Sequence, residues 1–332
     1  MNTNLRHISY CLIASLLFVA CRKESHPNTP EEPEEQYAIS MNAASVTDMT
    51  NSRALVTDDA DLQGTNLGVF AYKQLADGTK VSVFDNERIY YTNTDGWKYD
   101  NTKYWDKAAT EYCFVAYSPY SPYPTDNISY NNQNLTISNI PCWQTIDGSE
   151  TDYLVANSNG SANDYLSTSR SVPLDFKHIL CQLEVRVAKN AFLSSDYTLS
   201  SISYTNVPKL DEEADYTFPE DASNGFVISS TAQLMAELNN VVVPSDPDEN
   251  TSTTIKHLVV PFNASDNVKV TLAYKVNGTQ RPDAVVDTNL STLQAGKRYV
   301  LTLIFNSGAD IETSLEILDW VNEDVDEDKY NW

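Results

Sequence analysis

The sequence is poor in basic side chains. Its 332 residues include 22 Lys and Arg against 46 Asp and Glu, which gives a formal net charge of -24 at pH 7. Proteins that bind nucleic acid use clustered Lys and Arg to neutralise the phosphates, so the composition argues against nucleic acid as a partner. Acidic charge of this size keeps unassembled copies of a protein apart through mutual repulsion.

Cysteine is scarce as well, and its spacing fits neither a metal site nor a disulfide framework. Of the five cysteines, Cys11 and Cys21 belong to the N-terminal apolar run and its end, which leaves Cys113, Cys142 and Cys181 without a CxxC pair. Apolar, strand-like text surrounds Cys113 and Cys181, so we expect buried free thiols, with one disulfide as the alternative. Stability must therefore come from hydrophobic cores.

The chain also lacks recognisable catalytic machinery. It has no HExxH, GxSxG, GxGxxG or P-loop motif, the signatures of metal, nucleophile and phosphate chemistry. Beyond the first apolar run only His26, His178 and His257 remain, and we expect His178 to be a packed, hydrogen-bonded structural residue. The acidic stretch 322–330 lacks the glycine and distant glutamate of an EF-hand calcium loop. The sequence thus predicts no enzyme, cofactor or metal site.

Long hydrophobic runs are missing too. A membrane-spanning helix needs about 20 apolar residues, and the apolar run 11–20 is too short to supply them. It follows the basic Arg6 and suits the core of a secretory signal. Small residues before Cys21 match a lipoprotein cleavage site, with Phe18 where Leu is usual; a plain signal cut near a chance cysteine is the alternative. We predict a lipoprotein signal peptide at 1–20 and a lipid on Cys21.

The segment 21–36 has the composition of a tether. Its text, CRKESHPNTPEEPEEQ, is rich in Pro and Glu and has almost no apolar side chains. Such a segment cannot bury enough surface to offset the entropy of ordering. We therefore expect a disordered acidic tether that ends where alternating text begins at Tyr37.

From there on, the sequence is typical of a β protein, with short β-branched and aromatic runs between turn residues. In LEVRV, for example, Leu183, Val185 and Val187 alternate with charged residues, as in a strand with one buried face. The expected strands cover residues 67–72, 80–84, 112–117, 135–140, 180–187, 199–205, 226–229, 255–262, 268–276, 299–305 and 315–320.

Helical pattern is scarce. The best candidate is 231–238 (TAQLMAEL), which Ser230 or Thr231 could cap. A polar segment at 157–168 is the natural boundary between domains. We predict an all-β fold with at most short helices, in which one β-sandwich domain covers 37–165 and a second covers 166–332 and ends in an acidic tail.

Aromatic residues are abundant, with 20 Tyr and 5 Trp. Exposed rings can stack on sugars, but in a β-rich domain most rings pack in the core or pair across strands. We expect the core role; the alternative is a surface lipoprotein that binds glycans through exposed rings. The residues whose exposure decides between these are Trp97, Tyr99, Tyr104, Trp105, Tyr117, Tyr120, Tyr123 and Trp143.

Several phrases follow one another along the chain in a recognisable order. The two longest are WKYDNTKYWDKAATEYCFVAYSPYSP (97–122) and VPLDFKHILCQLEVRV (172–187), and the shorter ones are LGVFAY (67–72), TDYLVANS (151–158), LSSISYTNVP (199–208), LQAGKRYVLTLIF (293–305) and ETSLEILDW (312–320). Together they resemble the fimbrillin family of type V pilin subunits from Bacteroidia-type bacteria. The first long phrase is similar to the family's signature of spaced aromatic residues, and the second resembles the opening of its C-terminal domain.

The resemblance implies two transthyretin-like β-sandwich domains in tandem and a structural role in a cell-surface fimbria that supports adhesion to a host or bacterial surface. It also implies export as a lipoprotein to the outer membrane, where a trypsin-like protease removes an N-terminal strand. A segment from a neighbouring subunit then adds to the open sheet edge, and backbone hydrogen bonds and alternate side chains fix its register.

The sequence offers matching parts. After Lys23 there is no Lys or Arg until Arg53, so a cut between Arg53 and Ala54 would free a strand at 37–53; the alternative is an ordinary surface arginine. We expect Tyr37, Ile39 and Met41 to carry the removable strand.

At the other end, Leu315, Ile317 and Trp320 suit a strand that takes part in exchange. The sequence leaves open whether this segment is a donor or the fixed last strand with a loose tail, and hence whether the subunit belongs to the stalk, the tip or the anchor.

Overall fold

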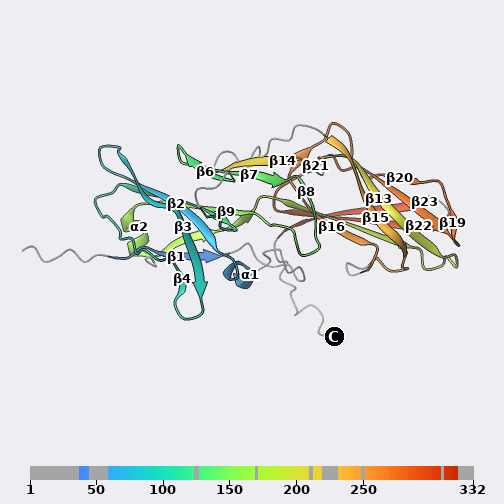
Figure 1. The fold of residues 1–332 in the computed structure, drawn as a ribbon, viewed down its shortest axis with the longest axis horizontal. Coiled ribbons are helices and arrows are strands. Elements are labelled where there is room, and N and C mark those ends of the chain that lie inside the picture. The colour runs from blue at the N-terminus through green and yellow to red at the C-terminus, as the bar shows by residue number, and fades with distance from the viewer. Residues whose placement is uncertain are drawn as a thin grey trace, which may run out of the picture. The chain divides into compact units, whose positions relative to one another are not determined.

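The computed structural model describes residues 37–44, 59–122, 127–168, 171–208, 212–218, 231–247, 251–307 and 310–320, and all of them belong to one compact unit that starts at Tyr37. This part of the chain consists mostly of strands, with two short helices, α1 (Asp59–Gln63) and α2 (Ala162–Ser167) (Figure 1). Within it, no helix has the length and apolar character needed to cross a membrane. The predicted all-β fold is confirmed.

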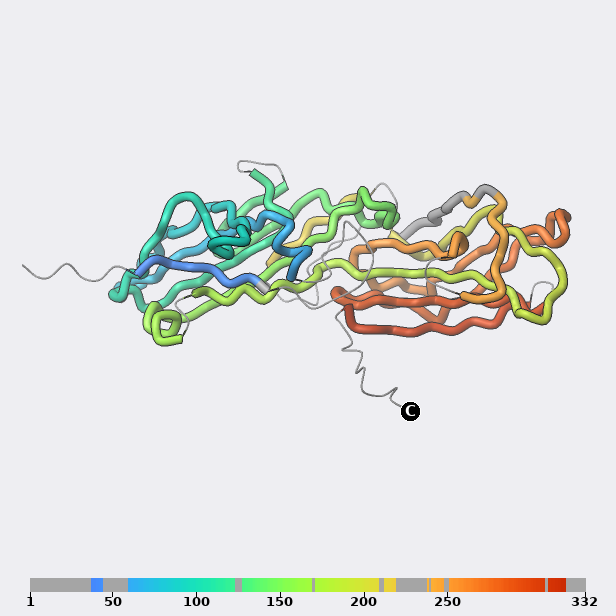
Figure 2. Tube along the Cα trace, turned by 90° about the horizontal axis from the view of Figure 1, so that it is seen from below, coloured from blue at the N-terminus to red at the C-terminus, as the bar shows by residue number. Residues whose placement is uncertain are grey.

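A six-stranded sheet forms one wall of the first core. Its order is β11-β9-β5-β2-β3-β4, and the strands are β2 (Leu67–Gln74), β3 (Lys80–Thr92), β4 (Gly96–Lys98), β5 (Glu111–Ser118), β9 (Leu154–Gly160) and β11 (Lys177–His178). A two-stranded parallel sheet of β1 (Ser40–Ala44) and β10 (Ser171–Asp175) also contributes side chains to this core. Figure 2 shows these two segments side by side although they are far apart in sequence. Buried side chains of β1, β2, β5, β9 and β10 share this core.

The second core lies between a five-stranded and a four-stranded sheet, with orders β23-β22-β12-β16-β8 and β15-β13-β18-β19. The first contains β8 (Trp143–Thr145), β12 (Cys181–Lys189), β16 (Thr254–Val259), β22 (Lys297–Ser307) and β23 (Asp310–Asp319). The second contains β13 (Tyr197–Pro208), β15 (Thr231–Val242), β18 (Lys269–Val276) and β19 (Thr279–Gln280), and β20 (Ala284–Asp287) also pairs with β18. A small pair joins β17 (Phe262–Asn263) to β21 (Thr292–Leu293).

A third core draws residues from both halves of the chain, among them Phe70, Leu180 and Trp320. Over it lies a three-stranded sheet of β6 (Ile128–Asn131), β7 (Asn134–Pro141) and β14 (Glu213–Phe218). Strand pairs therefore cross residue 165 in both directions, since β8 pairs with β16 and β14 pairs with β7. The domain limits at 37–165 and 166–332 stay a prediction.

The predicted strands that fall on described residues all overlap strands of the structure, whereas other strands, such as β10 and β14, were not predicted. In β12, Leu183, Val185 and Val187 all face the second core, as the alternation in LEVRV predicts. At the β18–β19 hairpin, Asn277 and Gly278 have φ values of 49° and 79°, the left-handed conformation that a two-residue hairpin turn requires. The predicted strand at 226–229 lies outside the described residues.

The predicted helix at 231–238 is wrong. These residues form β15, which pairs antiparallel with β13, so that Leu234 lies opposite Tyr204. Ala, Leu, Met, Glu and Gln favour helices by only a few tenths of a kcal/mol each, and isolated helices shorter than about 12 residues are marginal in water. Pairing with a long neighbouring strand overrides that preference.

Candidate strand-exchange site

The N-terminal segment, residues 37–44, contributes alternate side chains to the first core. Ile39, Met41 and Ala43 are 2%, 5% and 7% exposed and belong to that core. Ala38, Ser40 and Asn42 are exposed between them, as the alternation of a strand requires. Tyr37 is partly buried and packs against the same core, so the predicted strand residues Tyr37, Ile39 and Met41 lie together.

Backbone hydrogen bonds hold this segment on both sides. On one side β1 pairs in parallel with β10, with Met41 opposite Val172. On the other, the Ile39 N–H donates to the Lys103 carbonyl at 2.8 Å, and the Trp105 N–H donates to the Tyr37 carbonyl at 2.9 Å. The segment thus fills a slot between β10 and residues 103–105.

Two aromatic side chains fasten the segment further. The Tyr99 hydroxyl donates to the Ile39 carbonyl at 2.6 Å and accepts from the Lys103 N–H at 3.2 Å. Trp97 Nε1 donates to the Ala43 carbonyl at 3.0 Å. Burial raises the pKa of Tyr99, so its hydroxyl keeps its proton and remains a donor at neutral pH. Both rings come from the aromatic stretch that the sequence displays at 97–122.

The aromatic residues of this stretch mainly serve the core. Trp105 is 6% exposed and stacks on Tyr165 with ring centroids 4.8 Å apart. Tyr117 and Trp143 are 1% and 2% exposed, whereas Tyr104 is 49% exposed; Trp97, Tyr99 and Tyr120 are partly buried, and Tyr123 is outside the described residues. The described rings therefore do not gather into an exposed platform for sugars.

The predicted processing and lipid sites are not part of the described structure. Arg53 and Ala54 fall between the end of β1 at Ala44 and the start of α1 at Asp59. Cys21 precedes Tyr37, where the description begins. Both assignments stay predictions from the sequence.

The C-terminal residues form an edge strand. β23 lies at the end of the five-stranded sheet and pairs antiparallel with β22, with Leu315 opposite Leu301 and Ile317 opposite Tyr299. Leu315 is partly buried against the second core, whereas Ile317 is 55% exposed. In this structure the segment is thus the last strand of its own sheet, and its role as a donor stays a prediction.

Trp320, directly after β23, is deeply buried, in contrast to the strand itself. It is 1% exposed, and its ring stacks on His178 with centroids 4.0 Å apart and planes 5° apart. His178 Nδ1 lies 3.0 Å from Asp152 Oδ2, and both side chains are 1% exposed. The predicted structural role of His178 is confirmed; its pairing with Asp152 and Trp320 was not anticipated, because no local pattern links such distant positions.

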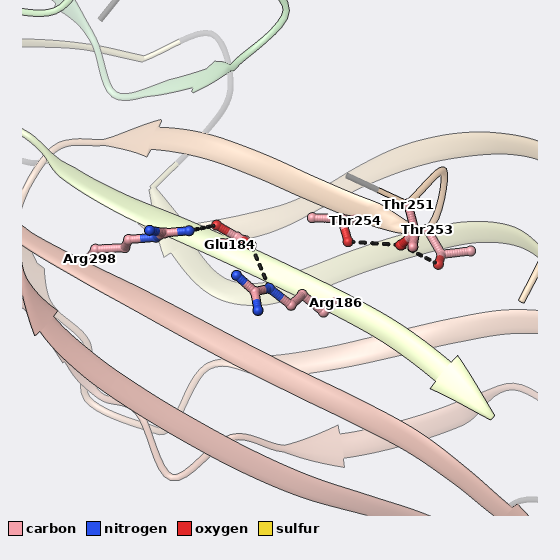
Figure 3. A network of polar contacts seen from close by, with 6 residues as sticks. All are labelled: Glu184, Arg186, Thr251, Thr253, Thr254 and Arg298. Atoms are coloured by element: carbon pink, nitrogen blue, oxygen red, sulfur yellow. Dashed lines mark hydrogen bonds and ion pairs between the residues drawn. The ribbon is translucent and has the colours of Figure 1, made fainter. Parts of the chain in front are cut away.

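A second buried polar group joins two strands of the five-stranded sheet. The fully buried carboxylate of Glu184 on β12 accepts from Arg186 Nε and from Arg298 Nη2 on β22, both at 2.6 Å (Figure 3). Nearby, Thr251 Oγ1 lies 3.3 Å from Thr253 Oγ1 and 3.1 Å from Thr254 Oγ1. No group of His, Cys, Asp and Glu within the described residues could hold a metal ion.

His257 is buried among hydrogen-bonding rings. Trp143 Nε1 donates to His257 Nδ1 at 3.0 Å, so the proton of the neutral ring is on Nε2, 3.2 Å from the Tyr204 hydroxyl. Burial lowers the pKa of His257 to about 3. This histidine is therefore neutral at physiological pH and serves the packing of the second core.

The described cysteines are buried free thiols, as predicted: Cys113, Cys142 and Cys181 form no disulfide. Burial raises the pKa of Cys142 to about 12 and raises that of Cys181 further. Thiols in this state are protonated and inert.

Comparison with known proteins agrees with the fold. A family model described as fimbrillin-like matches residues 52–320. A fimbrial protein from Bacteroides vulgatus has a similar solved structure, with a TM-score of 0.52, 16% identity, and coverage of 86% of this chain and 99% of that chain. A candidate cell adhesion protein from Bacteroides ovatus also has a similar structure, with a TM-score of 0.52 and 17% identity; the match covers 87% of this chain and 99% of that chain. At these identities the likeness concerns the fold alone. No curated protein matches the sequence.

Proposed function

Since this chain belongs to the fimbrillin-like family, a family of structural pilus subunits and not of enzymes, we propose that it enters a cell-surface fimbria by strand exchange. In this proposal the N-terminal segment is a temporary strand. A strand from a neighbouring fimbrial subunit takes its place after proteolysis.

The observation that supports this proposal most directly is the way the N-terminal segment is held. Ile39, Met41 and Ala43 fill the first core, yet within the described residues β10 has β1 as its only ladder partner. Removal of the segment would leave an open edge on β10 and an apolar slot beneath it. Such an edge is prone to pair with another chain, and strand addition uses this kind of site.

The proposed route begins with export. Cys21 carries the lipid that holds the precursor at the outer membrane, and the acidic tether spans the distance to the folded body. A trypsin-like protease then cuts between Arg53 and Ala54. Because the cut lies between β1 and α1, it separates the N-terminal segment from the rest of the first core without breaking any described strand.

The proposed donor is the C-terminal segment of another copy or of an accessory subunit. Leu315, Ile317 and Trp320 provide apolar side chains along it, and Ile317 is already largely exposed. The assembled fimbria would then present the subunits for adhesion to a host or bacterial surface. The position in the fimbria and the adhesive ligand are left to experiment.

Mild trypsin treatment of the mature protein tests the proposal. We expect one early cut with Ala54 as the new N-terminus by sequencing, followed by filaments in electron micrographs. The Arg53→Ala variant should stay uncut and monomeric, because its N-terminal segment continues to fill the slot. Lys80→Ala is the matched control, since Lys80 is an exposed basic residue at the start of β3 that is followed by Val81 and not by proline, and it should behave like the wild type. Filaments of equal length from uncut Arg53→Ala would show the proposal to be wrong.

A further inference from the structure

Most of β23 is weakly packed. Among its ten residues only Ile311, Leu315 and Leu318 are partly buried, and the remaining side chains are exposed. Its hold on the subunit along this length comes chiefly from the backbone ladder with β22. Edge ladders with few buried side chains belong to the low-stability end of local unfolding.

The buried Trp320 that follows β23 is the exception. In addition to its stacked ring, its backbone N–H donates to the Gly296 carbonyl at 2.7 Å, directly before β22 begins. Its side chain belongs to the third core, whereas Leu315 packs against the second. The strand is therefore fixed at its C-terminal end by the buried ring of Trp320, beside a partly exposed ion pair between Asp319 and Lys297.

The seat of Trp320 is built by the segment that continues β10. His178 lies in β11, three residues after β10 ends at Asp175, and β11 pairs with β9 of the six-stranded sheet. Between them, Phe176 is fully buried in the first core together with Ile39 and Met41. The residues that flank the slot for the N-terminal segment thus lead directly to the ring on which Trp320 stacks.

We propose that Trp320 is a releasable anchor that keeps β23 in its own subunit, and that loss of the N-terminal segment loosens this anchor through β10, Phe176 and His178. The C-terminal strand then becomes available to a second copy of the chain only after the slot has opened. This device rests on the proposed strand exchange and adds its order of events: an uncut subunit can neither receive nor donate a strand.

Hydrogen exchange followed by mass spectrometry tests the anchor in the full mature chain. In uncut Trp320→Ala, amides of β23 should exchange at least about tenfold faster than in the wild type, because the largest buried contact of the strand is lost. Amides of β18, in the other sheet of the second core, should be unchanged. Ile317→Ala, on the same strand but largely exposed, is the matched control and should change β23 by less than about twofold.

Variants of the seat separate anchoring from simple loss of volume. Both His178 variants are made in an Asp152→Asn background, so that neither leaves the buried carboxylate beside a removed histidine. There His178→Ala removes the stacking partner and should resemble Trp320→Ala, whereas His178→Phe keeps a flat ring and should restore most of the protection of β23. Equal exchange of β23 in Trp320→Ala and Ile317→Ala would overturn the anchor, as would faster exchange spread evenly over all strands.

Opening of the N-terminal slot tests the coupling. In a Met41→Asp chain cut after Arg53, the buried charge expels the N-terminal segment, and β23 should exchange about tenfold faster at concentrations where size exclusion shows monomers. When Met41→Asp and the cut after Arg53 are introduced into the Trp320→Ala chain, the exchange of β23 amides should become no faster than in uncut Trp320→Ala. Unchanged β23 exchange in the cut Met41→Asp chain would overturn the coupling.

The two proposals fail in different ways. A cut wild-type chain that never forms filaments, yet shows faster exchange of β23, contradicts strand exchange and supports the anchor. Filaments in which β23 stays as protected as in the uncut monomer contradict the anchor and support strand exchange by another segment.

Discussion

At the scale of single residues, the stability of the fold depends most clearly on the buried charge of Glu184. Its carboxylate bridges Arg186 and Arg298 and so joins β12 to β22. Removing one partner of a buried ion group leaves uncompensated charge, which is strongly destabilising. The two arginines are partly exposed, so water offsets part of that cost.

We therefore expect Glu184→Ala to lower the free energy of unfolding by about 3 kcal/mol. Glu316→Ala, an exposed carboxylate on the same sheet, should change it by less than about 0.5 kcal/mol. Urea denaturation followed by circular dichroism measures both. Similar midpoints for the two variants would mean that the Glu184 network contributes nothing to stability.

The low pKa of His257 predicts a pH dependence of stability. Folding depresses its pKa from 6.5 to about 3, so between these values the unfolded chain binds the additional proton. The contribution of neutral His257 to the free energy of unfolding is fully present above pH 6.5. It falls as the pH decreases toward 3, by at most about 1.4 kcal/mol per pH unit. His257→Gln should flatten the dependence of the urea midpoint on pH between 7 and 4, and an identical slope in both proteins would contradict this assignment.

At the scale of elements, we expect the alternate apolar side chains of the N-terminal segment to hold it in its slot. Met41→Ala in the uncut chain should cost about 2–3 kcal/mol, because it empties part of the first core. Its exposed neighbour Asn42 supplies the control, and Asn42→Ala should cost less than about 0.5 kcal/mol. Thermal unfolding measures both, and equal losses would argue against a side-chain-filled slot.

Elements also show what the sequence could and could not predict. The alternation of apolar and charged residues identified β12 as a strand, but the expectation of one buried face was wrong, because Gln182 and Glu184 on the opposite face are buried as well. The helix at 231–238 failed because weak local preference yields to pairing with β13. The segment around Ile39 was recognisable as a strand, but its contact with Tyr99 is 60 residues distant in sequence, and no local pattern encodes such a pairing.

At the scale of the whole molecule, composition and order of motifs predicted more than any single site. Alternating strand-like text predicted a β-rich fold, and the resemblance of the ordered phrases to the fimbrillin family implied a structural subunit; the family match agrees. The pairing of strands from before residue 165 with strands from after it was not predictable, because the sequences of β8 and β14 do not indicate which sheet each strand joins. Sequence patterns report the local environment of a strand and say little about its partner.

The parallel pairing of β1 with β10 has a consequence for a filament. Parallel and antiparallel ladders use different hydrogen-bond patterns, so a replacement strand that keeps the register of Met41 opposite Val172 must run in the same direction as β1. Every subunit added in this way points the same way as the one before it. In the proposed exchange such a contact would be heterologous, so a filament built from it would have a head and a tail that differ.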